Sequence, residues 1–153
     1  MTLDATDRAI LNELQHDANG SNNDLADRVG LSPSAALRRV RKLESEGVID
    51  RYVALLDPRS IGRGTTAFVE ISLASQEEAT LDAFEAAVVD SPDVMACHLM
   101  AGDADYIVQV ACADVADYER IHRTHLATLP GVTRIRSSFS LRTVANRTAF
   151  DLP

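Results

Sequence analysis

The spacing of apolar residues changes once along this chain of 153 residues, and this change constrains the fold more than any other feature. In the first third, apolar residues recur at helical intervals, as Ile10, Leu11 and Leu14 do. From Ala67 to Leu73 they instead alternate with polar residues, which is typical of a half-buried strand. We therefore expect a helical unit followed by a unit that mixes strands and helices.

Three short helices are predicted before residue 48, at Leu3–His16, Ser21–Gly30 and Ser32–Gly47. Each of the last two begins at a serine that can cap a helix and ends at a glycine that can adopt a left-handed conformation. Only Leu31 separates these two helices, and so tight a connection is typical of a helix-turn-helix pattern. The first helix is expected to pack against the other two.

The third predicted helix has an apolar side and a basic side. Its apolar side holds Ala36, Leu37, Val40 and Leu43. A solvated basic face is one explanation of the other side, but the helix-turn-helix pattern favours contact with double-stranded DNA. Small side chains let the backbone approach base edges, and arginines reach phosphates or guanines. The predicted DNA-contacting residues are Ser32, Ser34, Ala35, Arg38, Arg39, Arg41 and Lys42, with Arg51 beyond the helix.

The segment Val48–Leu56 has a strand-like composition and predicts either a small wing or an extended linker strand. Arg59–Gly64 contains two glycines and no periodicity, which favours a hinge. The expected organisation is a DNA-binding domain at 1–57, a linker at 58–64 and a second domain at 65–153.

The second half predicts four strands and two helices. The strands are expected at Ala67–Leu73, Val94–Met100, Tyr106–Cys112 and Val132–Val144, and the helices at Gln76–Val89 and Val115–Leu129. This β-α-β-β-α-β order predicts an α+β ferredoxin-like sandwich, with two helices on one face of an antiparallel sheet. The other face is left to pair with a second copy, which predicts a dimer. Two recognition helices about 34 Å apart would favour a pseudo-palindromic DNA operator.

The charge balance is unusual for a DNA-binding protein. The net charge is -8, with 23 acidic against 15 basic residues, and Lys42 is the only lysine. Such an acidic, lysine-poor surface is expected of a protein from a halophilic archaeon, where concentrated salt shortens the Debye length to about 3 Å or less and removes long-range repulsion from DNA. Arginine excess alone could instead reflect codon bias.

Several other classes of function are disfavoured. The chain has no apolar run of about 20 residues and no secretion signal, so we expect a cytoplasmic protein without a membrane partner. Phosphate loops, nucleophile elbows and paired catalytic motifs are missing, so no enzyme and no cofactor are expected. Cys97 and Cys112 lie on separate predicted strands and are expected to be buried thiols. His122 and His125, even with Cys97 and His98, lack the spacing of a metal site, and no metal is expected.

Short motifs in both halves of the chain make it resemble the Lrp/AsnC (feast/famine) group of transcription regulators. The matching stretches are Leu3-Asp4 with Ile10-Leu11, Leu31-Ser32-Pro33, Arg39-Val40, Leu43-Glu44 with Gly47-Val48-Ile49, Asp57-Pro58, Gly102-Asp103-Ala104-Asp105-Tyr106, Tyr118-Glu119-Arg120 and Leu129-Pro130-Gly131-Val132. The resemblance implies a winged helix-turn-helix domain joined to a ligand-responsive domain. It also implies homodimers that often assemble into tetramers or octamers.

The glycine-acid hairpin between the second and third predicted strands is the candidate effector site. The pattern alone favours an ordinary tight turn, because Gly and Asp are the commonest turn residues. The resemblance implies that an amino acid binds beside this hairpin, between regulatory domains, with help from the final strand. The predicted effector-binding residues are Met100, Ala101, Gly102, Asp103, Ala104 and Asp105 on the hairpin, with Thr133, Arg136, Ser137 and Ser138 on the final strand.

The sequence therefore predicts a DNA-binding transcriptional regulator whose assembly or DNA affinity responds to an amino acid. Two alternatives are an architectural DNA-compacting protein without an effector and a metabolite-binding assembly protein with a merely solvated basic helix.

Overall fold

The computed structural model describes residues 2–153 and divides them into two compact units. The first unit holds residues up to Leu55 together with Val144–Pro153, and the second holds Leu56–Thr143. This division differs from the expected one at both borders. The last ten residues belong to the helical unit, and the expected linker at 58–64 belongs to the sheet unit.

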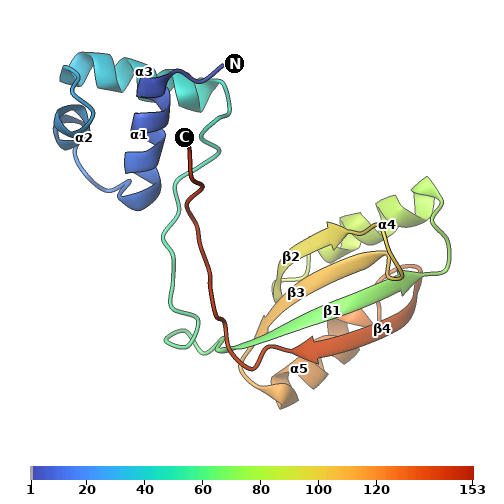
Figure 1. Cartoon of the computed structure of the whole chain (residues 1–153). Helices are drawn as coiled ribbons and strands as arrows, with labels where there is room; N and C mark the ends of the chain where they lie inside the picture. The colour runs from blue at the N-terminus through green and yellow to red at the C-terminus, as the bar shows by residue number, and fades with distance from the viewer. Residues whose placement is uncertain (1) are drawn as a thin grey trace. The chain divides into compact units, whose positions relative to one another are not determined.

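Three helices form the first unit: α1 (Ala5–His16), α2 (Asn22–Arg28) and α3 (Pro33–Ser45) (Figure 1). Asp4 and Ser21 each form a capping box at the start of a helix, in which the cap side chain and the third helical residue satisfy one another's backbone N–H. Ile10, Leu11 and Leu43 make the core. The helical spacing of apolar residues therefore predicted this unit well.

Leu37 departs from the expected apolar side of α3. It is 38% exposed, whereas Ala36 and Leu43 are fully buried. Leu37 lies at the rim of a shallow groove between α2 and α3, beside Leu25 and Val40. It is therefore a border residue of the helix-turn-helix rather than a core residue.

The segment after α3 has no strand partner among residues 2–153. Gly47 adopts a φ of 70°, which favours glycine, and ends the helix as predicted. Beyond it, the Tyr52 hydroxyl donates a hydrogen bond of 2.9 Å to Glu44. Of the two expectations for Val48–Leu56, the structure shows an unpaired segment and no paired wing strand.

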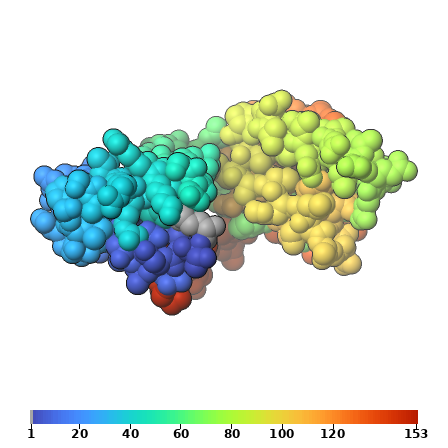
Figure 2. Space-filling view, turned by 90° about the horizontal axis from the view of Figure 1, so that it is seen from above, coloured from blue at the N-terminus to red at the C-terminus, as the bar shows by residue number. Residues whose placement is uncertain are grey.

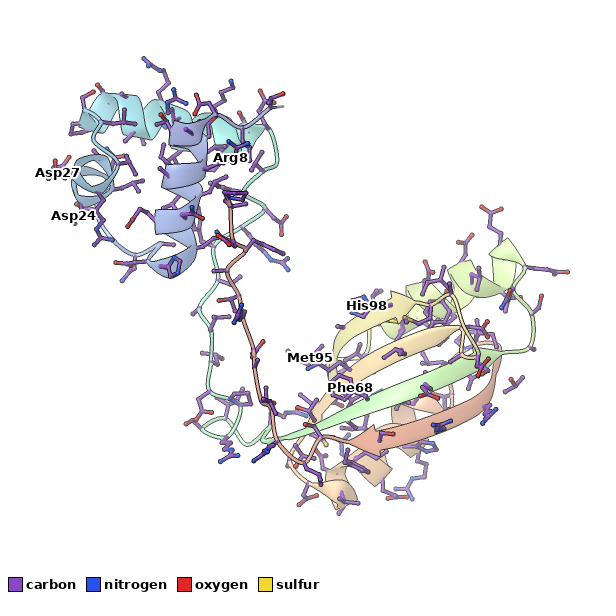
Figure 3. The ribbon with its side chains drawn as sticks, viewed as in Figure 1. Arg8, Asp24, Asp27, Phe68, Met95 and His98 are labelled. Carbon is purple, nitrogen blue, oxygen red and sulfur yellow. The ribbon has the colours of Figure 1, made fainter. Side chains whose placement is uncertain are left out.

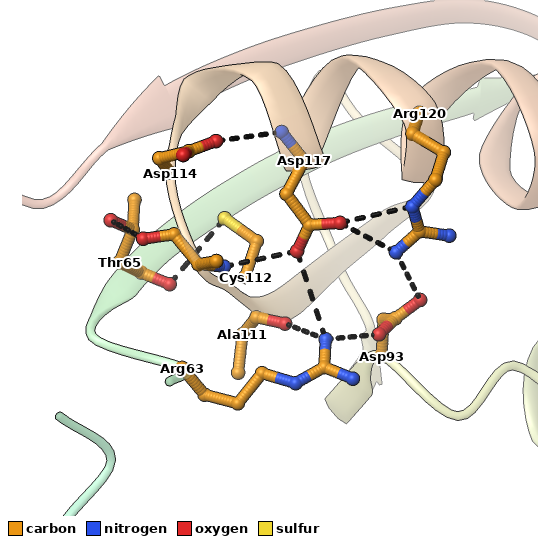
Figure 4. A network of polar contacts seen from close by, with 9 residues as sticks. Arg63, Thr65, Asp93, Ala111, Cys112, Asp114, Asp117 and Arg120 are labelled. Carbon is orange, nitrogen blue, oxygen red and sulfur yellow. Dashed lines mark hydrogen bonds and ion pairs between the residues drawn. The ribbon is translucent and has the colours of Figure 1, made fainter. Parts of the chain in front are cut away.

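The expected hinge is a hydrogen-bonded turn of the second unit. The Ser60 hydroxyl donates to the Asp57 carboxylate at 2.6 Å, and the Arg63 N–H donates to the Pro58 carbonyl at 2.7 Å. The Arg63 side chain then binds the buried carboxylate of Asp93 (Figure 4). These hydrogen bonds attach the 58–64 segment to the second unit, because they pair polar groups that would face only solvent in a flexible linker.

The second unit is a four-stranded antiparallel sheet with two helices behind one face (Figure 1). Its strands are β1 (Thr65–Leu73), β2 (Val94–Leu99), β3 (Tyr106–Cys112) and β4 (Val132–Phe139), in the order β2-β3-β1-β4. Its helices are α4 (Glu78–Val88) and α5 (Val115–Ile121), with α5 continued by a π-helical turn at His122–Leu126. The α+β sandwich agrees with the predicted element order.

Two predicted elements are shorter than expected. The final strand stops at Phe139 rather than Val144, because β1 begins at Thr65 and leaves no partner beyond the bond from Ser140 to Thr66. The helix predicted to Leu129 changes to π-helical hydrogen bonding after Ile121.

The sheet has a buried face and an exposed face. Alternate residues of β1 and β3, including Val69, Val108 and Val110, are fully buried against the helices. Phe68, Met95 and His98 lie on the opposite face (Figure 3). Phe68 is 45% exposed and Met95 65% exposed, so this face carries uncovered apolar side chains. No helix among residues 2–153 has the length and apolar content needed to cross a bilayer.

Candidate functional sites

The start of α3 is an exposed surface with small side chains. The Ser32 hydroxyl accepts a hydrogen bond of 3.3 Å from the Ala35 N–H, and Pro33 occupies the first turn. Ser34 beside them is exposed. Because these side chains are small, another molecule can come close to the backbone at this end of the helix.

Three basic side chains follow on the exposed side of α3. Arg38, Arg41 and Lys42 are exposed, and none has an ion-pair partner among residues 2–153. Figure 2 shows the surface of α3, in cyan, uncovered by the rest of its unit. Three cations on one open helix face form a surface suited to phosphate groups.

Arg39 differs from its neighbours because its guanidinium is held by the protein itself. One nitrogen lies 2.8 Å from Asp4 Oδ2 and 2.7 Å from Asp7 Oδ1, so the side chain joins α3 to the start of α1. These carboxylates raise the pKa of Arg39. The Asp7 N–H and then Arg39 lower the pKa of Asp4. Arg39, predicted as a DNA contact, therefore has a packing role in this arrangement.

Charges elsewhere on the first unit are less suited to DNA. Asp24 and Asp27 are exposed on α2 (Figure 3). Hydrogen bonds from Ser21 lower the pKa of Asp24 and keep it ionised. Arg51 is 78% exposed and lies 3.5 Å from Asp50, which offsets part of its charge. Three exposed cations of this unit thus lie together on α3, which favours this helix as the place where a polyanion binds.

The hairpin between β2 and β3 is fixed at its base by a buried carboxylate. Asp105 accepts hydrogen bonds from the Leu73 N–H at 2.7 Å and from Gln76 Nε2 at 2.6 Å. Its own N–H donates to Ile71, and its carbonyl accepts from Met100. Asp105 is only 8% exposed, so the carboxylate is committed to holding the hairpin. This contrasts with its predicted role as an effector ligand.

A cavity of about 330 Å³ lies between this hairpin and the exposed face of the sheet. Its lining residues are Glu70, Ser72, Met100, Ala101, Gly102, Asp103, Ala104, Ile107, Arg134 and Arg136. The Arg136 guanidinium lies 3.6 Å from Glu70. Asp103 and Arg134 have no ion-pair partner within residues 2–153. The cavity therefore offers one free anion and one free cation.

Part of the predicted effector set lines this cavity. The lining includes Met100 to Ala104 and Arg136, but not Asp105, Thr133, Ser137 or Ser138. Ser137 faces the helices and bonds to the Tyr118 hydroxyl, while the Thr133 hydroxyl donates to the Ser72 carbonyl at 3.0 Å. Because side chains alternate along a strand, Ser137 points to the opposite face from Arg134 and Arg136, which line the cavity.

Sequence reasoning missed Glu70, Ser72, Ile107 and Arg134. Residues two apart on a strand share a face, so the prediction of Arg136 as a site residue could have been extended to Arg134. Glu70 and Ser72 lie opposite them, since Glu70 pairs with Arg136 and Ser72 with Arg134. That pairing register was not readable from the sequence.

Metal-ligating residues do not gather in the described part of the chain. Across residues 2–153, no group of three or more His, Cys, Asp or Glu side chains could hold a metal ion. Burial raises the pKa of the Cys97 thiol to about 11, so this thiol stays protonated near neutrality. Cys112 is fully buried and hydrogen-bonded to the Thr65 carbonyl.

Two protein-family models together match nearly the whole chain. Residues 3–50 match a winged helix-turn-helix DNA-binding domain, and residues 66–150 match the Lrp/AsnC ligand binding domain.

Full-length relatives agree with these matches. The Bkd operon transcriptional regulator of Pseudomonas aeruginosa is 43% identical over 96% of each chain. The leucine-responsive regulatory protein of Haemophilus influenzae is 42% identical over 88% of this chain and 81% of its own. The crystal structure of a Neisseria meningitidis transcriptional regulator in complex with L-Met superposes with a TM-score of 0.92 and 35% identity, covering 98% of this chain and 97% of that one.

Proposed function

Because the chain belongs to the Lrp/AsnC family of transcriptional regulators, with a helix-turn-helix and a ligand-binding domain, we propose that α3 enters the major groove of double-stranded DNA and that a neutral amino acid in the hairpin cavity controls this binding. A protein that acts on chromosomal promoters works in the cytoplasm, and we place it there. The observation that carries the proposal is the set of unpaired cations on the exposed face of α3.

The proposed DNA contact uses the two kinds of residue that α3 exposes. Ser34 and Ala35 lie at the helix end that approaches base edges, because they are small. Arg38, Arg41 and Lys42 neutralise phosphates or bind guanine. The chain as a whole has a net charge of -8, so its attraction to DNA depends on local basic surfaces such as this face.

Two copies are proposed to pair through the exposed face of the sheet. Phe68 and Met95 lie uncovered there, and pairing two such faces removes them from water. A twofold dimer would present two α3 helices to half-sites about one helical turn, or about 34 Å, apart. Further assembly into tetramers or octamers would use other surfaces.

The test of DNA binding compares Arg38→Ala with Arg123→Ala in the full chain. Both remove one exposed arginine, but Arg123 lies on the π-helical turn, where it pairs with Glu119. With duplexes selected from a random library, we expect Arg38→Ala to weaken binding about 5- to 150-fold, because a lost arginine-guanine contact costs about 1–3 kcal/mol. Arg123→Ala should bind like the unmodified protein. Fluorescence anisotropy measures both.

The half-site arrangement is tested with the same duplexes. Removing one half of the selected sequence should weaken binding sharply if a dimer reads both halves. Equal affinity for the half-site, or for every duplex offered, would contradict the proposal and favour the architectural alternative. Equal binding by the Arg38→Ala protein would contradict the assignment of α3.

The proposed effector site matches the groups of a zwitterion. After Arg136 pairs with Glu70, Asp103 remains for an ammonium group and Arg134 for a carboxylate. Met100 and Ile107 leave an apolar surface for the side chain. Since no further charged side chain among residues 2–153 is unpaired in the cavity, a neutral side chain fits best. The L-Met bound to the Neisseria relative and the leucine named for the Haemophilus relative are of this class.

Calorimetry with the twenty amino acids tests this site. We expect heat with neutral apolar amino acids, and weaker binding of the best one after Asp103→Asn or Arg134→Gln. Ser138→Ala is the matched control, because Ser138 is on β4 but outside the cavity. No binding by any amino acid, or binding that neither variant weakens, would overturn the effector assignment.

A further inference from the structure

The C-terminal segment of the chain returns to the DNA-binding unit. The chain passes into the second unit after Leu55 and leaves it again after Thr143, so Val144–Pro153 is part of the first unit (Figure 1). The first unit is therefore built from two separate stretches of sequence. The sequence did not indicate that Val144–Pro153 belongs to the first unit, because this segment has no regular periodicity.

Two amide side chains of α1 hold this segment by its backbone. The Gln15 side chain accepts a hydrogen bond of 2.7 Å from the Phe150 N–H and donates one of 3.1 Å to the Phe150 carbonyl. Asn12 donates a bond of 3.2 Å to the Leu152 carbonyl. One amide that satisfies both backbone groups of a residue copies the pairing of neighbouring strands.

Apolar contacts complete the attachment. Leu152 packs against the core formed by Ile10, Leu11 and Leu43 and is half-buried. The Phe150 ring, in contrast, is 79% exposed, so the backbone of this residue and not its side chain is held. The segment forms one wall of an apolar groove of about 580 Å³.

We propose that residues 149–153 act as a strap that stabilises the DNA-binding unit and gives it a second covalent connection to the ligand-binding domain. The strap limits the freedom of α1, because α1 supplies both amide groups that hold it. Since Arg39 of α3 binds Asp4 and Asp7 at the start of α1, a looser α1 loosens α3 as well. The strap thereby affects the DNA-contacting helix without touching DNA.

Three variants of the full chain test the strap. The first ends at Thr148, the second is Gln15→Ala, and the third is Phe150→Ala, which keeps the backbone groups and serves as the control. Amide hydrogen exchange and thermal unfolding are measured without DNA or amino acids, so the result does not depend on the proposed function.

We expect the Phe150 N–H to exchange at least about tenfold faster in Gln15→Ala, because it loses its acceptor. Ending the chain at Thr148 should speed amide exchange in α1. It should also lower the unfolding temperature of the first unit by about 4–8 °C, which is the shift expected when a small domain loses about 1 kcal/mol of stability. Exchange in β1 and β3 should stay unchanged. Phe150→Ala should stay close to the unmodified protein in α1.

Three results would contradict the proposal. One is a Phe150 N–H that exchanges at the unprotected rate in the unmodified chain. Another is a chain ending at Thr148 whose first unit keeps its exchange rates and unfolding temperature. If Phe150→Ala destabilised α1 as much as the shortened chain does, the backbone clamp would likewise be wrong.

Discussion

Arg38 and Arg39 are neighbours in sequence but have different structural roles. Arg38 is exposed and unpaired within residues 2–153, whereas Arg39 binds Asp4 and Asp7. Arg39 is half-buried at the border between the buried and exposed sides of α3, and the sequence predicted it only as a DNA contact. The sequence did not predict the partners, because Asp4 and Asp7 were recognisable only as residues at the start of a helix. Side-chain roles at such borders depend on contacts distant in sequence.

Asp4 gives a prediction for the pH dependence of stability. Its pKa in the folded protein lies below the ordinary 3.8, because the Asp7 N–H and Arg39 favour the ionised form. The stability it contributes is therefore fully present above 3.8 and is lost as the pH falls through the folded pKa. Asp4→Asn keeps a good cap but loses the charge.

Thermal unfolding of Asp4→Asn should therefore be measured from neutral pH downward. We expect the variant to melt lower than the unmodified protein at neutral pH, and the two curves to converge as the pH falls below 3.8. A difference that stays constant at all pH values would mean that the charge of Asp4 contributes nothing to stability.

Most helices and strands were predictable because their signals are local. Caps, terminating glycines and apolar periodicity depend on residues within a few positions of one another. The segment 58–64 was expected to be a hinge for the same reason, since its two glycines are a local sign of flexibility. Arg63 is held instead by Asp93 and by the Ala111 carbonyl, which are distant in sequence (Figure 4).

The charged network at this turn holds elements from several parts of the sheet unit. Asp93 is 3% exposed and binds Arg63, while Arg120 lies 3.8 Å from it and bonds to Asp117 at 2.6 Å. The Ala113 N–H and then Arg120 lower the pKa of Asp117. The turn, the start of β2 and α5 are thus joined by alternating charges.

Replacing Asp93 tests how much this network stabilises the second unit. Asp93→Ala leaves Arg63 without its buried acceptor and should lower the free energy of unfolding by about 1–3 kcal/mol. Asp90→Ala removes the same charge from an exposed position and should change it little. Urea unfolding of the full chain measures both, and similar small losses would show that the network is not stabilising.

The candidate effector site shows the same division between local and distant information. The hairpin was visible as Gly102 and Asp103, and both line the cavity. Asp105 was predicted to bind the effector, but its carboxylate lies at the base of the hairpin and accepts hydrogen bonds from Leu73 and Gln76. Alternation along a strand makes neighbouring positions face opposite ways, and the register that fixes which way came only with the structure.

At the scale of the whole molecule, fold class followed from element order, but domain borders did not. The order β-α-β-β-α-β predicted the sandwich. The attachment of Val144–Pro153 to α1 could not be predicted, because it is made by backbone groups that every sequence has. The net charge, in contrast, follows directly from the composition, and it predicts how stability depends on salt concentration.

The acidic surface predicts that stability rises with salt concentration. At a net charge of -8, repulsion between carboxylates opposes compaction, and multimolar KCl shortens the Debye length to about 3 Å or less. We expect the unfolding temperature to increase steadily from low to multimolar KCl. A chain that is fully folded and equally stable at low salt would contradict the halophilic source expected from the composition.

The return of the final residues to α1 also affects the order in which a newly made chain matures. Ribosomes release the N-terminal end first, at about 5–20 residues per second, so α1, α2 and α3 emerge long before Leu152. The hydrogen-bond partners of the Asn12 and Gln15 amides lie 140 and 135 positions downstream, at Leu152 and Phe150, and are synthesised later. The DNA-binding unit therefore becomes complete only after the sheet unit has been synthesised.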